Sequence, residues 1–529
     1  MKKFTVLCLA GLLVLAFGAT GYAQAPTLTW SGTGYFEIGT YWTQNVPAYG
    51  NVASSGTYRI APAAYSTFSG APFFSPLNVP GNLLDRKVAF WDQRTRLWIT
   101  GAMGKELSGT VYFEIDGTWG GASNLTSVTR DANNVGAWNA DRTAVEVAGA
   151  YLTFGIPYFG IPVPMTMQIG VQPLAIRPAI LVYSDGAGIT GGIKLDPVLI
   201  KPVYFKALEG GVGTADDVDI YGLEATAKLG TFSLGGYGLY YNMNSYPFQV
   251  AAPNATSLAA FGATLFPQVQ GTQRAKMWWL GAYADGKLGP VNLNFDVIYD
   301  YGRVLSKGNV DVPNVKYSGW VSRLKVDFPM DQFNIGVTGM YASGTDANRS
   351  SASGQPGTLT ASGALADKVG SFVVPPGSEA GPINSESVVV YSMWAGSTGG
   401  AGLLESANYQ ALSRGPFGGS WFAKLYASVK ATPSYKITLQ GLYIGDTTKN
   451  GNTYGTAVIP GTAVLRDDKR IGVEADVISE WSIYKNLLFS AGVGYLWAGP
   501  AMDLRQGALF DNFSMKNPWA VRTDLKYFF

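Results

Sequence analysis

The chain contains 529 residues, of which only 14% are charged, a share well below the roughly 25% usual for a soluble domain. It has no histidine and one cysteine, Cys8, which excludes a Ser-His-Asp triad, a Cys-His pair, a histidine-ligated metal and an attached c-type haem. The 38 basic and 36 acidic residues nearly balance, which argues against a nucleic-acid partner. We therefore expect no cofactor, no metal and no enzymatic activity.

The first residues predict an export signal. Lys2 and Lys3 precede a continuous apolar run over 4–17, and small residues follow it. We expect cleavage after Ala23, because the alternative cut after Ala25 would leave a proline directly behind the cleaved bond. Residues 1–23 are then the removed signal, and residues 24–529 form one domain; a membrane anchor is the alternative.

Beyond this signal the chain has no apolar run of 18 residues, so transmembrane helices are not expected. Apolar and polar residues alternate instead, which is typical of strands with two unlike faces. In 107–119, Val111, Phe113 and Ile115 share one face, and Glu114 and Asp116 share the other. The same alternation occurs in 163–172, 218–229, 290–301, 317–328, 332–342, 420–430, 435–445, 469–477, 486–497 and 519–529.

Short links between these strands alternate with long ones rich in Gly, Ser, Thr, Asn and Pro. Short periplasmic turns and long extracellular loops are the layout of an outer-membrane barrel. We predict a closed antiparallel transmembrane β-barrel of about 18 strands, or 16 if the least regular strand, near 201–208, is absent. Apolar residues such as Val493 and Tyr495 would then face lipid; in a soluble sandwich, the alternative fold, they would face inward.

The last strand, WAVRTDLKYFF over 519–529, ends the chain on an aromatic residue. Its outward residues include Tyr527 and Phe529. This ending resembles the signal by which the bacterial outer-membrane assembly machinery recognises barrels. The alternative is an ordinary edge strand that ends in phenylalanine.

Three blocks carry a more specific resemblance: FWDQRTRLWITGAMGKELSGTVYFEIDGTWGG (90–121), VEVAGAYLTFGIP (145–157) and MQIGVQPLAI (167–176). They resemble the N-terminal third of homotrimeric porins from sulfate- and metal-reducing Gram-negative bacteria. The resemblance implies a homotrimer in outer-membrane lipid that passes small hydrophilic solutes. The link 344–419 is longer than a plain porin needs, and the link 173–186 is short for the constriction loop of general porins.

Charged residues at inward-facing strand positions are the candidate channel lining. They are Glu37, Arg94, Arg96, Glu114, Asp116, Glu146, Glu224, Lys228, Asp296, Arg323, Lys325, Asp327, Lys424, Arg470, Glu474, Asp476, Arg522, Asp524 and Lys526. Opposed charges across a water-filled bore would create a transverse field that favours hydrated polar solutes and sets ion preference. The alternative is that they form cross-strand pairs that stiffen the wall.

Three local motifs match known sites less well. GAGITG at 186–191 fits a dinucleotide loop but opens a strand, and SIYK at 482–485 fits an acyl-enzyme motif but lies in a short turn. Asp216, Asp217 and Asp219 could hold a calcium ion, although a solvated acidic loop explains them as well.

The sequence therefore predicts a porin for passive diffusion of small hydrophilic solutes and ions. The alternatives are a substrate-selective channel, a barrel sheath around a partner such as an electron carrier, a surface adhesin, or an outer-membrane hydrolase.

Overall fold

The computed structural model describes most of the chain in segments separated by gaps. The described residues are 27–45, 87–119, 134–135, 145–157, 163–178, 180–210, 213–246, 273–306, 312–351, 354–378, 386–391, 412, 414–506 and 511–529. The predicted export signal, residues 1–23, lies outside them, as do most of the expected long links 43–87, 120–142 and 243–274. Within the described segments, no helix has the length and apolar character that a membrane span requires.

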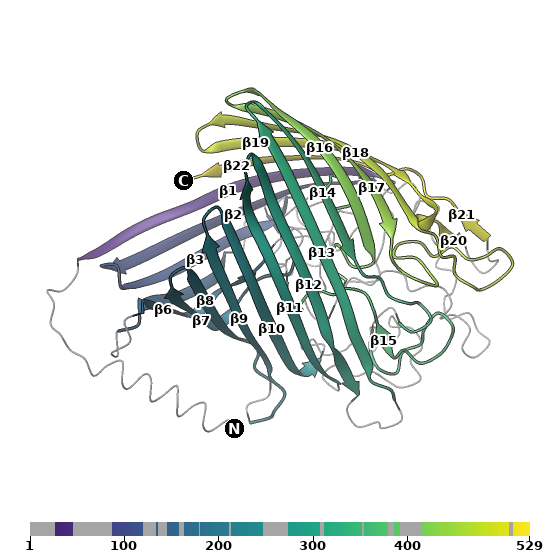
Figure 1. Ribbon diagram of the computed structural model, residues 1–529, viewed down its shortest axis with the longest axis horizontal. Coiled ribbons are helices and arrows are strands. Elements are labelled where there is room, and N and C mark those ends of the chain that lie inside the picture. Colours follow the sequence, from purple (N-terminus) through teal and green to yellow (C-terminus); the bar gives the residue numbers. More distant parts are fainter. Residues whose placement is uncertain are drawn as a thin grey trace.

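Eighteen long strands form one closed antiparallel barrel (Figure 1). They are β1 (Leu28–Gln44), β2 (Lys87–Met103), β3 (Leu107–Trp119), β5 (Glu146–Gly155), β6 (Met165–Ile176), β7 (Val182–Leu195), β8 (Val198–Leu208), β9 (Val218–Leu229), β10 (Phe232–Tyr246), β11 (Gln273–Leu288), β12 (Val291–Ser306), β13 (Val315–Met330), β14 (Phe333–Ala342), β16 (Ser420–Thr432), β17 (Tyr435–Asp446), β18 (Arg470–Tyr484), β19 (Leu487–Ala498) and β22 (Trp519–Phe528). The predicted closed 18-strand barrel is confirmed. The 16-strand alternative is wrong, because β8 occupies the region of the least regular expected strand.

The barrel closes where the first strand meets the last. β1 pairs with β2 on one side and with β22 on the other. Phe529 and Gly34 exchange two backbone hydrogen bonds of 2.8 and 3.0 Å at the end of this seam. Since every neighbouring pair of long strands is hydrogen-bonded, the wall has no open edge along the length of β22.

Among the described residues, five short elements lie in the long links of the barrel. They are β4 (Asn134–Val135), β15 (Lys368–Val369), β20 (Leu504–Gln506), β21 (Asp511–Phe513) and the 3-10 helix η2 (Pro500–Met502). β15 pairs in parallel with Lys316 and Tyr317 of β13, at the long-loop end of that strand. The chain after β14 thus returns to the wall before it enters β16.

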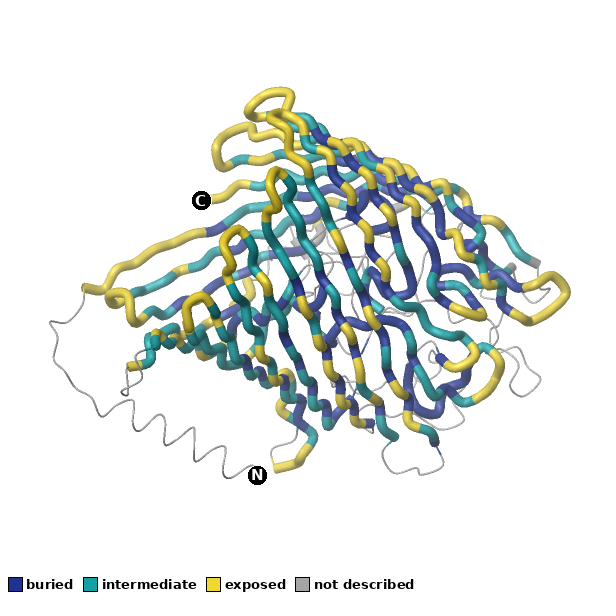
Figure 2. The backbone as a smooth tube through the Cα atoms, viewed as in Figure 1, coloured by how far each residue is buried: buried dark blue, intermediate teal, exposed yellow. Residues whose placement is uncertain are grey.

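Side chains alternate between the two faces of the wall. On β11, Met277 and Trp279 point inward and are fully buried, whereas Trp278 and Leu280 point outward and are 44% and 50% exposed. Val493, near the middle of β19, is 52% exposed. Figure 2 shows this alternation along the strands, together with exposed turns at the hairpin ends. The buried core of the protein therefore consists of inward-pointing side chains, and apolar residues cover the outer face of the barrel.

Two strand boundaries differ from expectation. The link expected over 173–186 shortens to 177–181, since β6 continues to Ile176 and β7 already begins at Val182. β18 continues to Tyr484, beyond the regular alternation, which ends at residue 477. In both cases the strand continues beyond the regular alternation because neighbouring strands supply hydrogen-bond partners for its backbone.

Candidate functional site

The long segment between β14 and β16 is here called the inner loop, and its described residues are 343–351, 354–378, 386–391, 412 and 414–419. Some of these residues cover part of the inner face of the barrel. Phe372, Val373 and Val374 of the inner loop are buried among the inward side chains of the wall. Trp279 Nε1 of β11 donates a hydrogen bond of 2.8 Å to the carbonyl oxygen of Val373. The inner loop therefore narrows the interior on the side of β10–β13.

A buried carboxylate on the wall fixes this part of the inner loop. Asp300 of β12 is fully buried, and its two oxygens accept backbone N–H groups from Gly319 of β13 at 3.1 Å and from Val373 at 3.2 Å. A Cβ atom on Gly319 would lie 2.4 Å from the carbonyl oxygen of Ser371. Glycine is required at this position because the inner loop crosses the wall here at backbone contact.

The short link 177–181 also folds toward the interior and meets the inner loop. Ser378 Oγ donates a hydrogen bond of 2.8 Å to the carbonyl oxygen of Leu181. Arg177 forms ion pairs with Asp285 of β11 at 2.6 Å and with Asp296 of β12. Two links that are far apart in sequence thus join over the same part of the inner wall.

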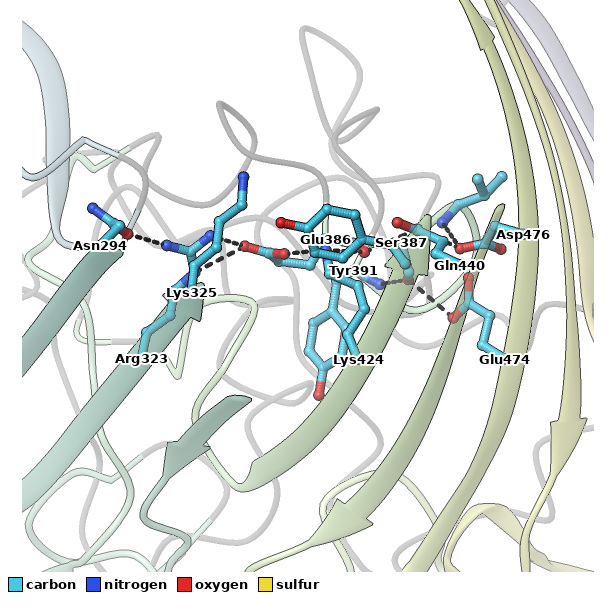
Figure 3. Close-up of polar contacts among 12 residues, drawn as sticks. Asn294, Arg323, Lys325, Glu386, Ser387, Tyr391, Lys424, Gln440, Glu474 and Asp476 are labelled. Atoms are coloured by element: carbon cyan, nitrogen blue, oxygen red, sulfur yellow. Dashed lines mark hydrogen bonds and ion pairs between the residues drawn. The ribbon is translucent and has the colours of Figure 1, made fainter. Parts of the chain in front are cut away.

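A second part of the inner loop, residues 386–391, lies along the wall from β13 to β18 (Figure 3). Its carboxylate, Glu386, sits between Arg323 of β13 and Lys424 of β16, and all three side chains are less than 8% exposed. Arg323 Nε donates to Glu386 at 2.9 Å, and Lys424 Nζ donates to its backbone carbonyl at 3.0 Å. Burial raises the pKa of Glu386, but Lys424 and Arg323 outweigh it and hold this pKa below its usual range.

The same segment donates backbone hydrogen bonds to carboxylates of the wall. Val389 and Val390 donate their N–H groups to Glu474 of β18 at 2.6 and 3.0 Å, and Val388 donates to Asp476 at 3.2 Å. A Cβ atom on Gly494 of β19 would lie 2.7 Å from Cβ of Val388, so this wall position also needs glycine. The segment 386–391 is therefore held to β13 and β16 by the carboxylate of Glu386, and to β18 by its backbone N–H groups.

The charges predicted on β2 and β3 form direct cross-strand pairs. Arg94 lies 2.9 Å from Asp116 and 3.1 Å from Glu114, and Arg96 pairs with Glu114. Arg96 also donates to the hydroxyl of Tyr183 on β7 at 3.0 Å. Arg94 keeps 26% exposure, whereas Arg96 keeps 8%. Arg96 is thus part of the packed interior, and Arg94 remains open to solvent inside the barrel.

Most of the remaining predicted lining residues fall into four groups. Glu37 and Lys526 form an ion pair of 2.8 Å across the seam, with Arg522 and Asp524 on the same face of β22. Lys325 and Asp327 of β13 lie 3.6 Å apart. By contrast, Arg323, Glu474 and Asp476 hold the inner loop and are covered by it. Glu146 and Arg470 are exposed at the first residues of β5 and β18 and belong to no buried network of the described residues.

Arg470 illustrates why regular alternation in the sequence is not sufficient to predict which face of a strand a residue occupies. The register between β17 and β18 shifts between Ile444 and Gly445, so Ile471 is buried while Arg470 is exposed. A bulge changes which residues share a face, and the alternating pattern of the sequence does not reveal it.

Sequence reasoning missed the residues that fasten the links, namely Arg177, Asp285, Asp300 and Glu386. Asp300 has a readable signal, because it continues the inward series Asn292, Asn294, Asp296 of one strand. Arg177 and Glu386 lie in links without periodicity and have no such signal.

The candidate cation loop and the C-terminal aromatic residues are also placed. Asp217 pairs with Lys206 at 3.2 Å, Asp219 accepts from Tyr204 at 3.0 Å, and Asp216 accepts from Thr214. No group of three or more Asp, Glu, Cys or His side chains that could hold a metal ion occurs in the described segments. Tyr527 and Phe529 are 45% and 49% exposed, with their rings 5.7 Å apart.

No protein-family model and no curated protein matches this sequence. Solved structures with a similar course include the outer membrane protein OpdK of Pseudomonas aeruginosa, with a TM-score of 0.46, 8% identity and coverage of 94% of this chain and 98% of that one. OccK11 (OpdR) of the same organism has a TM-score of 0.44 and 8% identity, with coverage of 94% of this chain and 95% of that one. OccK8 (OprE) has a TM-score of 0.45 and 9% identity, with coverage of 94% and 98%.

The location of the protein follows from its own wall. A closed barrel satisfies every backbone group of its strands internally, and only such structures or helices can span hydrocarbon. The outward side chains near the middle of the wall are mostly apolar, with aromatic pairs such as Trp320 and Tyr341 at 4.9 Å and Tyr240 and Trp278 at 4.3 Å toward the long-loop end. The protein is therefore an outer-membrane β-barrel of a bacterium.

Proposed function

We propose that this barrel is a porin-type channel through which small hydrophilic solutes and ions diffuse passively. The observation that carries the proposal is the solvent exposure of charged side chains on the inner face. Arg94, Lys325 and Asp285 keep 26%, 37% and 35% exposure although they point into the barrel. A charged group pays a large penalty away from water, so these side chains support a water-filled path.

A substrate-selective channel is the second candidate, and the contact between the two inward links favours it. The inner loop and the link 177–181 are fastened to each other and to β11–β13 by buried hydrogen bonds and ion pairs. A constriction built from fixed groups selects solutes by size and by their polar contacts more strongly than an unobstructed bore does. In a substrate-selective channel, charged groups near the constriction, such as Arg177 and Asp285, would form hydrogen bonds with a passing solute.

Assembly and export are part of the proposal. The resemblance to homotrimeric porins supports a trimer, and the exposed Tyr527 and Phe529 support recognition by the assembly machinery. The apolar run behind Lys2 and Lys3 supports removal of residues 1–23. Cross-linking of the purified protein in detergent, together with the mass of its N-terminal peptide, tests the trimer and the cleavage point separately.

Single-channel recording in planar bilayers separates the candidate functions. Large, weakly selective steps are expected of a diffusion porin. Small steps that a particular solute blocks would instead establish the selective channel. A correctly folded barrel that conducts nothing would overturn both and support the sheath or adhesin alternatives.

A further inference from the structure

Four basic residues form a row across the outer face of the barrel at its long-loop end. Lys276 of β11 lies directly opposite Arg303 of β12, Arg303 lies opposite Lys316 of β13, and Lys316 lies opposite Lys368 of β15. The first three of these side chains are exposed. We call these four residues the basic row.

The basic row forms no ion pair within the part of the chain that the structure describes. The nearest acidic neighbour along the chain, Asp367, is bound by Arg349 at 3.0 Å; Arg349 and, to a smaller degree, Lys316 lower its pKa. The preceding link 247–272 contains no Asp or Glu at all, and 307–311 contains one lysine and one aspartate.

Like charges directly opposite each other on neighbouring strands destabilise a sheet. Three consecutive cross-strand pairs of this kind therefore raise the free energy of the isolated barrel. External anionic groups distributed along the row would reduce this repulsion. The row is thus better suited to a complex with an anion than to the protein alone.

The position of the row identifies the source of the anion. Trp278 and Tyr301 occupy the next outward positions on β11 and β12, toward the middle of the wall, and are 44% and 58% exposed. Trp320 continues this aromatic band on β13. Aromatic bands of outer-membrane barrels mark the interface between hydrocarbon and headgroups. The basic row lies one outward position farther, at the level of lipid headgroups.

We propose that the basic row binds the phosphate groups of an anionic lipid in the outer leaflet, outside the channel itself. Lysine and arginine donate charge-assisted hydrogen bonds to phosphate oxygens, and arginine can do so with two parallel bonds. The aromatic band below would contact the acyl chains of the same lipid. This site is separate from the interior and does not depend on which solutes the channel passes.

The test measures thermal unfolding of the intact barrel in neutral detergent micelles, with and without lipid A, a lipid that carries two phosphates. The test variant is Arg303→Ser with Lys316→Ser. The control is Lys287→Ser with Lys485→Ser, which removes the same charge at the short-turn end. For the natural protein, lipid A should raise the unfolding temperature, whereas phosphatidylcholine should not.

The test variant should unfold at a higher temperature than the natural protein in neutral micelles, because repulsion is relieved. Its apparent affinity for lipid A should fall about 25-fold, since a basic residue at an anionic surface contributes about fivefold. The control should respond like the natural protein. If the double variant does not fold, Arg303→Gln provides the same comparison with a smaller effect.

Three outcomes would overturn the proposal. In the first, lipid A stabilises the test variant as much as the natural protein. In the second, phosphatidylcholine stabilises the natural protein equally, so that lipid charge has no part. In the third, inorganic phosphate at the same phosphate concentration has the full effect, which would assign the site to a free anion. Conductance in neutral bilayers should be the same for all these variants, so the lipid site and the channel are tested independently.

Discussion

Two parts of the inner face hold their charges in different ways. On β2 and β3, the basic residues Arg94 and Arg96 pair with the acidic residues Glu114 and Asp116 across one hairpin. Strands of the wall thus neutralise each other's charges without the inner loop. On β13–β18, Arg323 and Lys424 are satisfied by Glu386, which the inner loop supplies. The first arrangement stiffens the barrel, whereas the second determines whether a loop stays inside it. Charges of similar appearance in the sequence therefore have different consequences for how much of the barrel interior stays open.

The most disruptive test of this comparison is Glu386→Gln. It removes the carboxylate that forms ion pairs with the buried Arg323 and Lys424, and removing one member of a buried ion pair costs about 3–5 kcal/mol. We expect the segment 386–391 to leave the wall and single-channel conductance to rise. The matched control is Asp367→Asn, a loop carboxylate whose ion pair with Arg349 is half exposed and is worth about 1 kcal/mol or less. Equal conductance in both variants would show that Glu386 does not hold the loop.

The outer wall common to both parts is tested by Val493→Arg. Val493 lies near the middle of β19, 52% exposed, opposite Val477 and Val521. An arginine facing hydrocarbon near the middle of the bilayer should lower the free energy of unfolding in lipid vesicles by about 2–4 kcal/mol. Val464→Arg, at a 59% exposed loop position, should cost nothing measurable. Equal stability of the two variants would contradict the assignment of the lipid-facing side.

Acid should weaken the contacts of Glu386 without any mutation. The pKa of Glu386 is lower in the folded protein than the ordinary glutamate value of 4.5, so its stabilising effect is fully present above about that pH. This effect is lost as the pH falls through the lowered pKa, since protonation removes the charge that Arg323 and Lys424 require. We expect the conductance of the natural protein to rise below pH 4.5 toward that of Glu386→Gln. A Glu386→Gln variant whose own conductance rises equally over this range would assign the transition to another group.

The smallest effect is expected for Arg94→Gln. Arg94 is 26% exposed on the inner face, and its removal leaves the charges of Glu114 and Asp116 less compensated. Reversal potentials in a salt gradient should shift modestly toward cations, with a loss of stability of about 1 kcal/mol or less. Arg349→Gln removes the same charge from an exposed position in the inner loop and should leave selectivity unchanged. An unchanged reversal potential for Arg94→Gln would place this residue away from the ion path.

The wall was predictable because it obeys a short-range rule. A strand in a barrel has a repeat of two, so the bounds of β3 and the facing of Val493 could be read from neighbouring residues alone. Even β8, the least regular strand, could be included in the predicted strand count because short and long links alternate along the chain. Where a bulge breaks the rule, as beside Arg470, neighbouring residues alone no longer determine which face a side chain takes.

The fastening of the links was not predictable, because it depends on contacts between residues far apart in sequence. Glu386 meets Arg323 from 63 residues away, and Arg177 meets Asp296 from 119 residues away. No local pattern records which charge of a link meets which charge of the wall. Asp300 is intermediate: its inward position was readable, but its role in binding the backbone of Val373 was not.

The hydrogen bonds between Phe529 and Gly34 have a consequence for synthesis. The sheet becomes a cylinder only when β22 lies beside β1, and β22 leaves the ribosome after every other strand of the wall. A chain cut short before residue 519 would keep seventeen strands but expose two unpaired borders, each able to capture another polypeptide. Synthesis of β22 therefore decides whether the wall closes into a barrel or remains an open sheet whose two edge strands can pair with other chains.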